Sequence, residues 1–576
     1  MKKFICILCM LMCFTTVMSA VYAADTVNNS NEFVIYVSPD GDDSGDGSPE
    51  KMLKTPAGVQ AFLRKSDILG KRPVRVVFKE GDYFIDKGLV FTEEDAGTAE
   101  NPVVWEAEKK GAVRFLGSTV LDSSKFTPVT DEAMLARIPA EARDKVVQMN
   151  LTEQGINIEA CPPYLWAGNK FTETYTELIV NDKEQMLSRW PNGENNYDYW
   201  TKVIEPFTTG TGKKGLEYGG TIKYDNPRLG RWTTANHAWI AGHVGSTYAI
   251  ERVTVSSVDP EKGYIISDES TVYGFKDSSP RGLQIFNLIE ELDCATEWYI
   301  DWDTNILYYF PAGEIDDNSV FELITLDENM ITFSKDTDFY MTIKGFELSR
   351  GKRRIVSLEG NNVSLDGCTI MYSKGDAAVY MSGECVNVTN NVIACHDANA
   401  IRVYGGGNMV KQSVRTSSKV TNNYMYDVGR MKVTGGHAIG QEGACVDIMH
   451  NTAHYMPQGT YSGGWEVRDT RVMYNEFYNF GMNISDVGAY YMRMSGSALG
   501  NEVAYNYFYD YGTVNSRLGN SVQGVYFDDG FSHGNCHHNT FIGGAAYGVQ
   551  VGGGKYNKVE SNIMVNMGKG PLVTDN

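Results

Sequence analysis

Two acidic segments near the end of the chain hold residues that could perform acid–base chemistry. They are Ser485–Arg493, which contains Asp486, and Gly524–Gly530, which contains Asp528 and Asp529. Hydrolysis of a glycosidic bond needs a carboxylic acid that protonates the leaving oxygen and a carboxylate that acts as base or nucleophile. Two neighbouring carboxylates also raise the pKa of one of them, which provides the acid. We therefore expect Asp486 and either Asp528 or Asp529 to form a catalytic pair.

The spacing of these carboxylates requires a bend in the chain. If Gly488 and Gly524 lie side by side on neighbouring strands, Asp486 stands two residues before its glycine and Asp528 four residues after its own. A straight strand would then separate the two carboxyl groups by roughly 20 Å, at about 3.3 Å per residue. The pair can form only if a bend or loop brings Asp486 back over the face of the sheet.

The doublet of Asp528 and Asp529 leaves open which carboxylate is used. Neighbouring side chains of a strand point to opposite faces. If Phe527 packs inward, Asp528 points outward and Asp529 inward, and a turn at Gly530 could reverse this order. An Asp-Asp-Gly sequence is also typical of an ordinary turn.

Four further side chains are candidates for contacting a substrate. Arg493 aligns near Asp529 and could form an ion pair or bind a sugar hydroxyl. Tyr490 and Tyr526 lie close to the acidic residues in the chain, and we expect them to shape the sugar site. His437 falls on a comparable strand two repeats earlier, where it serves either the substrate or the structure.

A short phrase repeats through the last part of the chain and sets its architecture. Each copy is a β-prone run followed by Asn, and successive Asn are 32, 28, 24, 31, 33 and 23 residues apart. Such a repeat cannot bury its own apolar face and must stack on its neighbours. The pattern predicts an all-β parallel β-helix with an Asn ladder at one corner, in which His450 and His538 are stack positions. The ladder residues are Asn391, Asn423, Asn451, Asn475, Asn506, Asn539 and Asn562.

The sequence predicts a signal peptide and three further segments. A positive start and a short apolar run predict a cleaved signal peptide over residues 1–23, and hence a secreted protein without a membrane span. Residues 33–119 would form an N-terminal cap and the first coils, and residues 120–335 a β-rich insertion whose tryptophans form either its core or sugar subsites. Residues 336–576 would form the main β-helix. No capping helix follows the last coil, so we expect a fragment or a missing C-terminal piece.

The N-terminal part holds a helix signal and an acidic loop. Thr55 and Pro56 are typical of the N-cap and first position of a helix, which would run to Leu63 and cover the open end of the β-helix. The loop at residues 40–47 could hold a structural Ca²⁺ or be a solvated turn. It lacks the spacing and the bidentate Glu of an EF-hand. We expect no metal at the catalytic site and no other cofactor.

The net charge narrows the possible partners, and the cysteine spacing indicates whether disulfides are present. The net charge is −21, and removal of Lys2 and Lys3 with the signal peptide makes it −23. Such a surface repels nucleic acid and anionic lipid, and it disfavours a polyanionic substrate unless a local basic groove is present. Seven irregularly spaced cysteines remain after the signal peptide, which indicates apolar fillers of the stack rather than a disulfide framework.

Several segments together resemble glycoside hydrolase family 141 and its β-helix relatives, over nearly the whole mature chain. The resemblance implies a right-handed parallel β-helix with a β-rich inserted domain and activity on plant cell-wall polysaccharide or oligosaccharide, with α-L-fucosidase and xylanase activities both represented. It also implies a catalytic pair of Asp, carried here to Asp486 and to Asp528 or Asp529. The loop at residues 494–498 departs from the family by lacking a Gly-rich stretch. The matching segments are Tyr36–Gly41, Phe91–Gly97, Ser188–Pro191, Leu292–Tyr299, Asp486–Tyr490 and Gly524–Gly530.

Two other classes of function fit the same scaffold. A polysaccharide lyase needs an Arg or Lys base beside a Ca²⁺-binding acidic cluster, and this chain offers few bases near its acidic segments. A non-catalytic glycan-binding protein would bind a polysaccharide without releasing a reducing sugar. The fold does not decide between these classes and a hydrolase, because β-helices host all three.

Overall fold

The computed structural model describes most of the chain. The described residues are 31–158, 176–193, 198–199, 202–205, 220–267, 273–277, 282–405, 418–443, 445–464, 466–496, 498–514 and 516–575. The predicted signal peptide lies outside them. Among the residues so described, no helix has the length and apolar character needed to cross a membrane.

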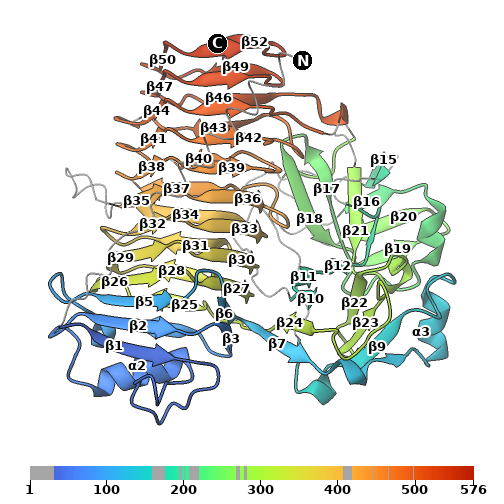
Figure 1. The fold of residues 1–576 in the computed structure, drawn as a ribbon. Coiled ribbons are helices and arrows are strands. Elements are labelled where there is room, and N and C mark those ends of the chain that lie inside the picture. The colour runs from blue at the N-terminus through green and yellow to red at the C-terminus, as the bar shows by residue number, and fades with distance from the viewer. Residues whose placement is uncertain are drawn as a thin grey trace, which may run out of the picture.

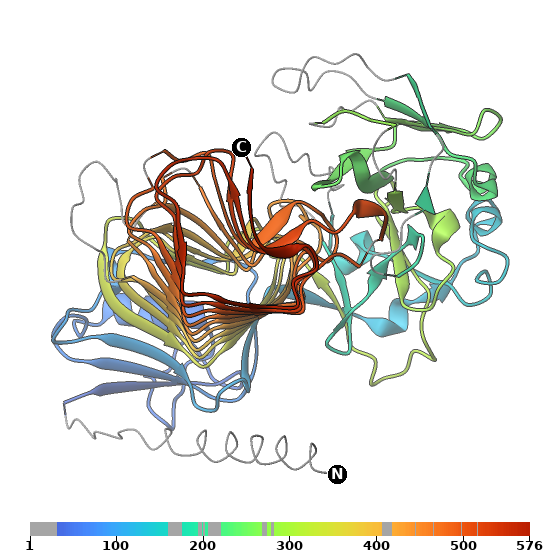
Figure 2. The same cartoon turned by 90° about the horizontal axis from the view of Figure 1, so that it is seen from above.

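A parallel β-helix forms one half of the molecule, and a second β-rich domain lies beside it (Figures 1 and 2). Three long sheets make up the β-helix. Sheet A has 12 strands from β1 (Phe33–Val37) to β50 (Lys558–Glu560), sheet B has 11 from β3 (Gly81–Phe84) to β51 (Ile563–Val565), and sheet C has 11 from β4 (Leu89–Phe91) to β52 (Gly570–Asp575). The predicted parallel β-helix is confirmed.

Apolar side chains at equivalent positions of successive coils stack inside the β-helix. In sheet A, the strand partners Val388, Val420, Ile448, Val472 and Val503 follow one another in register and are all buried. The free thiol of Cys536 extends this column to the next strand. The prediction that cysteines fill the stack is thus confirmed for Cys536, whereas Cys385 and Cys395 are only partly buried.

The predicted Asn ladder occupies the corner between sheets A and B. Asn451 is representative: its backbone N–H and its side-chain amide both donate to Asn475 Oδ1, at 2.9 and 3.0 Å. Its amide also donates to the Val420 carbonyl of the preceding coil at 2.9 Å. The buried amides therefore satisfy backbone groups that this sharp corner would otherwise leave without partners. The same bonds run from Asn391 to Asn562.

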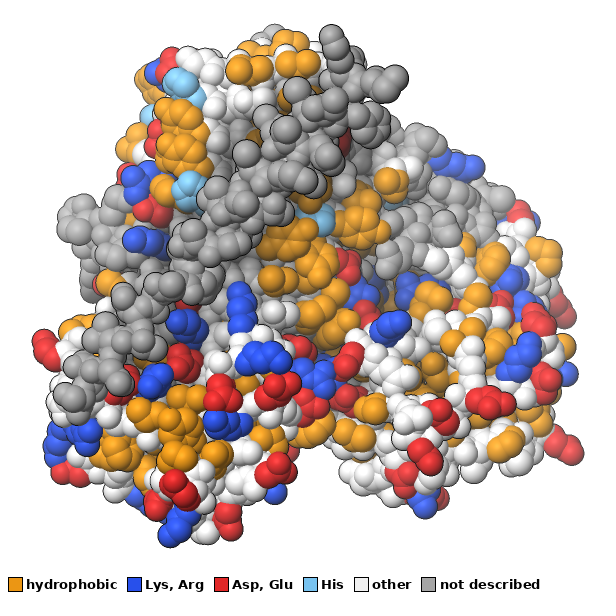
Figure 3. Space-filling view, viewed as in Figure 1, with side chains coloured by type: hydrophobic (Ala, Val, Ile, Leu, Met, Phe, Trp, Pro, Cys, Tyr) orange, Lys and Arg blue, Asp and Glu red, His pale blue; other side chains and the backbone are white. Residues whose placement is uncertain are grey.

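The residue before each ladder Asn adopts the left-handed conformation, with φ between 53° and 61°. Four of these corner residues stack as rings, with His450 on Tyr474, Tyr474 on Tyr505, and Tyr505 on His538, at centroid distances of 5.1–5.2 Å. The space-filling view shows hydrophobic side chains between histidines along the edge of the upper coils (Figure 3). His450 and His538 are thus stack positions, as predicted.

The N-terminal coils begin as the sequence predicts. Helix α2 (Pro56–Lys65) lies at the end of the β-helix beside β1 (Figure 1), and the Thr55 hydroxyl accepts the Gly58 N–H at 2.8 Å as its N-cap. In the acidic loop, Asp42 accepts the Ser44 N–H and Asp43 accepts the N–H groups of Lys54 and Thr55. Among the described residues, no group of three or more His, Cys, Asp or Glu side chains is placed to hold a metal ion.

The second domain is inserted between β6 (Val113–Leu116) and β25 (Ile331–Phe333) of the β-helix. It opens with β7 (Ser118–Leu121) and closes with β24 (Phe321–Ile324), which pairs antiparallel with β7. Four sheets with mainly antiparallel pairing build it. Trp232, Trp239 and Trp298 are buried in it, which matches the core alternative for the tryptophans.

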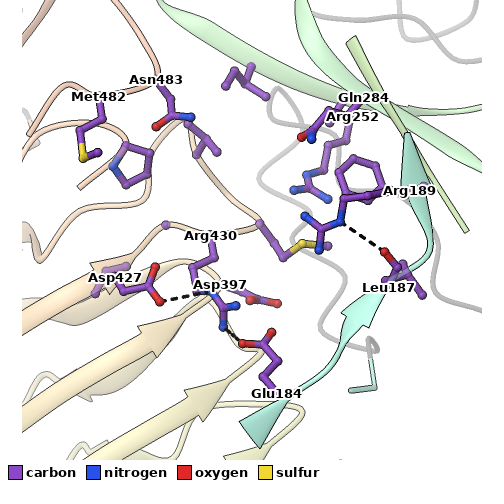
Figure 4. A pocket seen from close by; sticks show the side chains of 18 of the residues that line it. Glu184, Leu187, Arg189, Arg252, Gln284, Asp397, Asp427, Arg430, Met482 and Asn483 are labelled. Atoms are coloured by element: carbon purple, nitrogen blue, oxygen red, sulfur yellow. Dashed lines mark hydrogen bonds and ion pairs between the residues drawn. The ribbon is translucent and has the colours of Figure 1, made fainter. Parts of the chain in front are cut away.

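Buried ion pairs hold the inserted domain against the β-helix around a cavity of about 140 Å³. Arg430 of the β-helix pairs with Glu184 of the insertion and, at 3.6 Å, with Asp427 (Figure 4). Lys374, 1% exposed, pairs with Asp397 and with Glu177 of the insertion. Removal of one partner would leave a buried charge uncompensated, so these pairs fix the relative position of the two domains.

Candidate functional site

A hollow of about 1280 Å³ runs along sheet C and receives residues from both domains. Its lining comes from seven neighbouring strands, so it extends for roughly 29 Å at about 4.8 Å per strand. An elongated hollow of this kind suits an oligomeric ligand rather than a compact one. The seven strands are β34 (Asn399–Gly405), β37 (Ile439–Gly443), β40 (Tyr461–Gly463), β43 (Val487–Arg493), β46 (Val522–Asp528), β49 (Tyr547–Gly552) and β52.

The structure brings Asp486 and Asp528 into this one hollow. Asp486 directly precedes β43 and has a left-handed backbone, with φ 62°, while its N–H donates to the Ser521 carbonyl at 2.6 Å. Asp528 is the last residue of β46. The left-handed conformation of Asp486 turns the chain immediately before β43.

The Asp486 carboxyl is electrostatically coupled to its neighbours. Although part of the side chain is exposed to the hollow, the protein groups around the carboxyl displace water and raise its pKa. The negative charge of Asp528 raises the pKa further, and a hydrogen bond with Tyr526 lowers it in part. Asp486 therefore keeps its proton to a higher pH than an ordinary aspartate.

Tyr491 holds the Asp528 carboxylate, and Tyr526 lines the same hollow. The Tyr491 hydroxyl donates to Asp528 Oδ2 at 2.8 Å. Tyr526 interacts electrostatically with the carboxyl groups of both Asp486 and Asp528. Burial and the nearby carboxylates raise the pKa of both tyrosines well above the ordinary value, so they act as hydrogen-bond donors rather than phenolates.

Asp529 has a different environment from Asp528. It is exposed, has φ 44°, and its N–H donates to Asp528 Oδ1 at 2.8 Å. The turn that continues through Gly530, with φ 78°, keeps Asp529 on the surface although Phe527 packs inward. Both carboxylates line the hollow, but among the two only Asp528 is held by the described tyrosines.

The strand pairing differs by one residue from the expected alignment. Gly488 lies opposite Gln523 rather than Gly524, and Arg493 lies opposite Asp528. Arg493 is exposed and lines the hollow, as a sugar-contacting residue would.

The prediction that Tyr490 shapes the sugar site is wrong. Tyr490 is 1% exposed and stacks on Tyr461 in the core at 4.8 Å. Its neighbour Tyr491 points to the hollow instead, because alternate residues of the strand face opposite sides. Strand pairing decides which of two adjacent tyrosines points to the hollow. Sequence periodicity alone did not give this pairing.

His437 lines the hollow but is only 6% exposed. Its Nδ1 lies 3.2 Å from the Gly459 carbonyl, and burial lowers its pKa to about 4. The imidazole is therefore neutral at physiological pH and serves as a fixed polar group of the wall.

The hollow also contains residues that the sequence analysis missed. Tyr248 and Tyr273 reach it from the inserted domain, and Arg402 from β34 pairs there with Asp376 and Glu442. Among its described lining residues, seven are acidic and three are basic. The seven are Asp376, Glu442, Glu466, Asp486, Asp528, Asp529 and Asp575, and the three are Arg402, Lys432 and Arg493.

Comparison with known proteins supports the fold. No protein-family model matches the chain, and no curated protein sequence matches it. A solved structure described as a glycoside hydrolase superposes with a TM-score of 0.66 at 16% identity, over 94% of this chain and 97% of the other. A complex of XylC with xylose gives a TM-score of 0.48 at 13% identity, over 91% and 70% of the two chains.

A third similar structure is the GH136 lacto-N-biosidase from Eubacterium ramulus, with a TM-score of 0.36 at 12% identity, over 94% of this chain and 68% of the other. The TM-scores of the last two comparisons lie below 0.5, so they carry no weight for function. At 16% identity the first likeness concerns the fold alone. The chain therefore has a glycoside-hydrolase-like β-helix fold.

Proposed function

We propose that this protein is a secreted glycoside hydrolase whose catalytic pair is Asp486 and Asp528. One observation carries the proposal: Asp486 and Asp528, whose carboxylate Tyr491 holds, line the same elongated hollow. Burial and the negative charge of Asp528 raise the pKa of Asp486, which favours a protonated Asp486 beside the Asp528 carboxylate. One protonated and one ionised carboxyl group is the pattern that a glycosidase needs.

Each carboxyl group has a role in this proposal. Asp486, with its raised pKa, is the acid that gives its proton to the leaving glycosidic oxygen. Asp528, held by the Tyr491 hydroxyl, is the carboxylate that acts on the anomeric carbon or on the attacking water. Asp529 is the less favoured partner, since it lies on the turn after β46 and Tyr491 holds Asp528 instead. Arg493 lies opposite Asp528 and would contact a sugar hydroxyl.

The substrate we propose is a plant cell-wall polysaccharide or oligosaccharide, with α-L-fucosidase-like and xylanase-like activities as the first candidates. The resemblance to family 141 and the length of the hollow support this class. The excess of acidic side chains in the hollow disfavours a polymer of uronate residues, because like charges repel in a low-dielectric cleft. It therefore disfavours the polysaccharide lyase alternative as well.

A substrate screen tests the proposal. The secreted protein is incubated with nitrophenyl glycosides, soluble arabinoxylan and fucosylated xyloglucan, and released reducing sugar is measured, with proton NMR to read the anomer first formed. We expect release of a neutral sugar that does not require a metal ion. Formation of an unsaturated uronide, with its ultraviolet absorbance, would establish a lyase instead, and binding without any cleavage would establish a glycan-binding protein.

A further inference from the structure

An aromatic side chain at the tip of a hairpin of the inserted domain reaches the hollow. Strands β17 (Trp239–Ser246) and β18 (Ala249–Thr254) pair Ser246 with Ala249, so that Thr247 and Tyr248 form a two-residue loop. Tight loops of this length favour Asn-Gly and similar pairs. A Thr-Tyr pair breaks that local rule, and such exceptions concentrate at functional positions.

The hairpin tip is fixed next to Asp486. The Ser485 N–H donates to the Thr247 carbonyl at 3.1 Å, one residue before Asp486. Further along β18, the Ile250 N–H donates to the Thr434 hydroxyl at 2.8 Å. Two hydrogen bonds from different coils of the β-helix therefore hold the tip, which places Tyr248 close to the proposed acid.

The Tyr248 ring is the most exposed aromatic surface among the described residues that line the hollow. It is 37% exposed, whereas Tyr491 is half-buried and Tyr526 is 5% exposed. Tyr273 holds the ring edge-on, with centroids 5.0 Å apart at 86°. By contrast, the exposed Tyr474 and Tyr505 at the corner of the β-helix have neighbouring rings stacked on both of their faces.

A glycine makes room for this aromatic pair. A Cβ at Gly245 would come within 2.4 Å of Tyr273 Cβ and 2.6 Å of the Gly274 carbonyl oxygen. The segment that carries Tyr273 follows the edge of β17, where the Lys276 N–H donates to the Val244 carbonyl at 2.9 Å. The absence of a side chain at residue 245 thus allows Tyr273 to pack beside the hairpin and support Tyr248.

We infer that Tyr248 is a stacking platform for a pyranose ring of the substrate, bound beside the sugar that Asp486 and Asp528 cleave. An amphipathic ring at the wall of a polar hollow covers the C–H face of a sugar while leaving its hydroxyls to polar groups. The inserted domain would in this way complete the substrate site of the β-helix. This inference rests on the proposed function, since it assigns a subsite of the same hollow.

Glycan binding by the full-length mature protein tests the inference. Affinity electrophoresis through gels that contain soluble arabinoxylan or fucosylated xyloglucan compares the wild type with Tyr248→Phe, Tyr248→Leu and Tyr248→Ala. We expect Tyr248→Phe to bind as the wild type does, and Tyr248→Leu and Tyr248→Ala to bind roughly tenfold more weakly, which corresponds to about 1.4 kcal/mol. On the glycan that is cleaved, KM should rise more than kcat falls.

The control is Tyr556→Ala, because Tyr556 is 78% exposed outside the hollow and its loss should leave binding unchanged. Circular dichroism confirms that each variant is folded. Unchanged binding by a folded Tyr248→Leu protein would overturn the subsite while leaving the hydrolase proposal intact. Failure of the wild type to bind either glycan would overturn the subsite too, and the absence of hydrolysis of any glycoside would separately refute the proposed function.

Discussion

Tyr491 donates a hydrogen bond of 2.8 Å to Asp528 Oδ2 from the neighbouring strand of sheet C. The two residues are far apart in the chain and meet only because β43 and β46 pair in parallel. The phenol fixes one oxygen of the carboxylate, and the Asp529 N–H fixes the other, Oδ1, at 2.8 Å. This relationship makes the Asp528 carboxylate a positioned group rather than a surface charge.

Removal of that phenol should weaken catalysis without destroying the fold. In Tyr491→Phe, Asp528 loses a charge-assisted hydrogen bond, which is worth about 1.5–3 kcal/mol. We expect kcat on the cleaved glycan to fall roughly tenfold to a hundredfold, measured by release of reducing sugar. Tyr507→Phe is the matched control, since Tyr507 is exposed on sheet B away from the hollow. A Tyr491→Phe enzyme with unchanged kcat would show that Asp528 needs no positioning.

The raised pKa of Asp486 predicts how its replacement alters stability with pH. A carboxyl with a higher pKa in the folded state binds more protons there than when unfolded, so stability falls as pH rises through the ordinary range of an aspartate. Asn has no titrating carboxyl group, so Asp486→Asn removes this decrease of stability with rising pH. We expect the variant to raise Tm relative to the wild type at pH 7 and by less at pH 4, as measured by thermal denaturation. An equal change at both pH values would mean that Asp486 has an ordinary pKa.

The burial of His243 predicts that folding stability depends on pH in the opposite direction. Its Nε2 lies 2.9 Å from the Asn483 carbonyl across the domain junction, and burial lowers its pKa to about 4. The unfolded chain binds the extra proton first, so stability is lost as pH falls from about 6.5 towards 4. In His243→Gln, the decrease of Tm between pH 7 and pH 4.5 should be smaller than in the wild type. An identical decrease would exclude His243 as a contributor to acid sensitivity.

Substitution of a ladder Asn should lower the free energy of unfolding by a large amount. In Asn475→Ala, the backbone and side-chain N–H groups of Asn451 lose their shared acceptor, and the Ile448 carbonyl loses a donor. Each buried group left unsatisfied costs about 1–3 kcal/mol, so we expect the free energy of unfolding to fall by about 3 kcal/mol or more in urea denaturation. Asn387→Ala, at a half-buried position on sheet A, should cost under about 1 kcal/mol. Equal effects of the two substitutions would refute a special role for the ladder.

The β-helix could be predicted because its determinants are local and repeated. Each ladder Asn follows a β-prone run and a residue that tolerates a left-handed turn, so seven short phrases carry the same information. The N-cap at Thr55 is equally local, since one side chain and the following Pro56 define it. These features lie within a few residues of the structure that they specify.

The substrate site could be predicted only in part, because it depends on contacts between distant segments. The chemistry of carboxylates pointed to Asp486 and Asp528, which line one hollow, but the burial of Tyr490 and the exposure of Tyr491 to the hollow follow from strand pairing. Tyr248 gave no signal in the sequence, because the hydrogen bond between Thr247 and Ser485 joins the two domains. Periodicity and motif spacing carry no information about how an inserted domain docks.

The most direct test of the central claim is the activity of three single variants on the glycan that the screen identifies. We predict that Asp486→Asn and Asp528→Asn each lose about a thousandfold or more in kcat while keeping the circular dichroism spectrum of the wild type, and that Asp529→Asn loses less. Wild-type kcat in a folded Asp486→Asn or Asp528→Asn protein would contradict the assignment of these two residues as the catalytic pair.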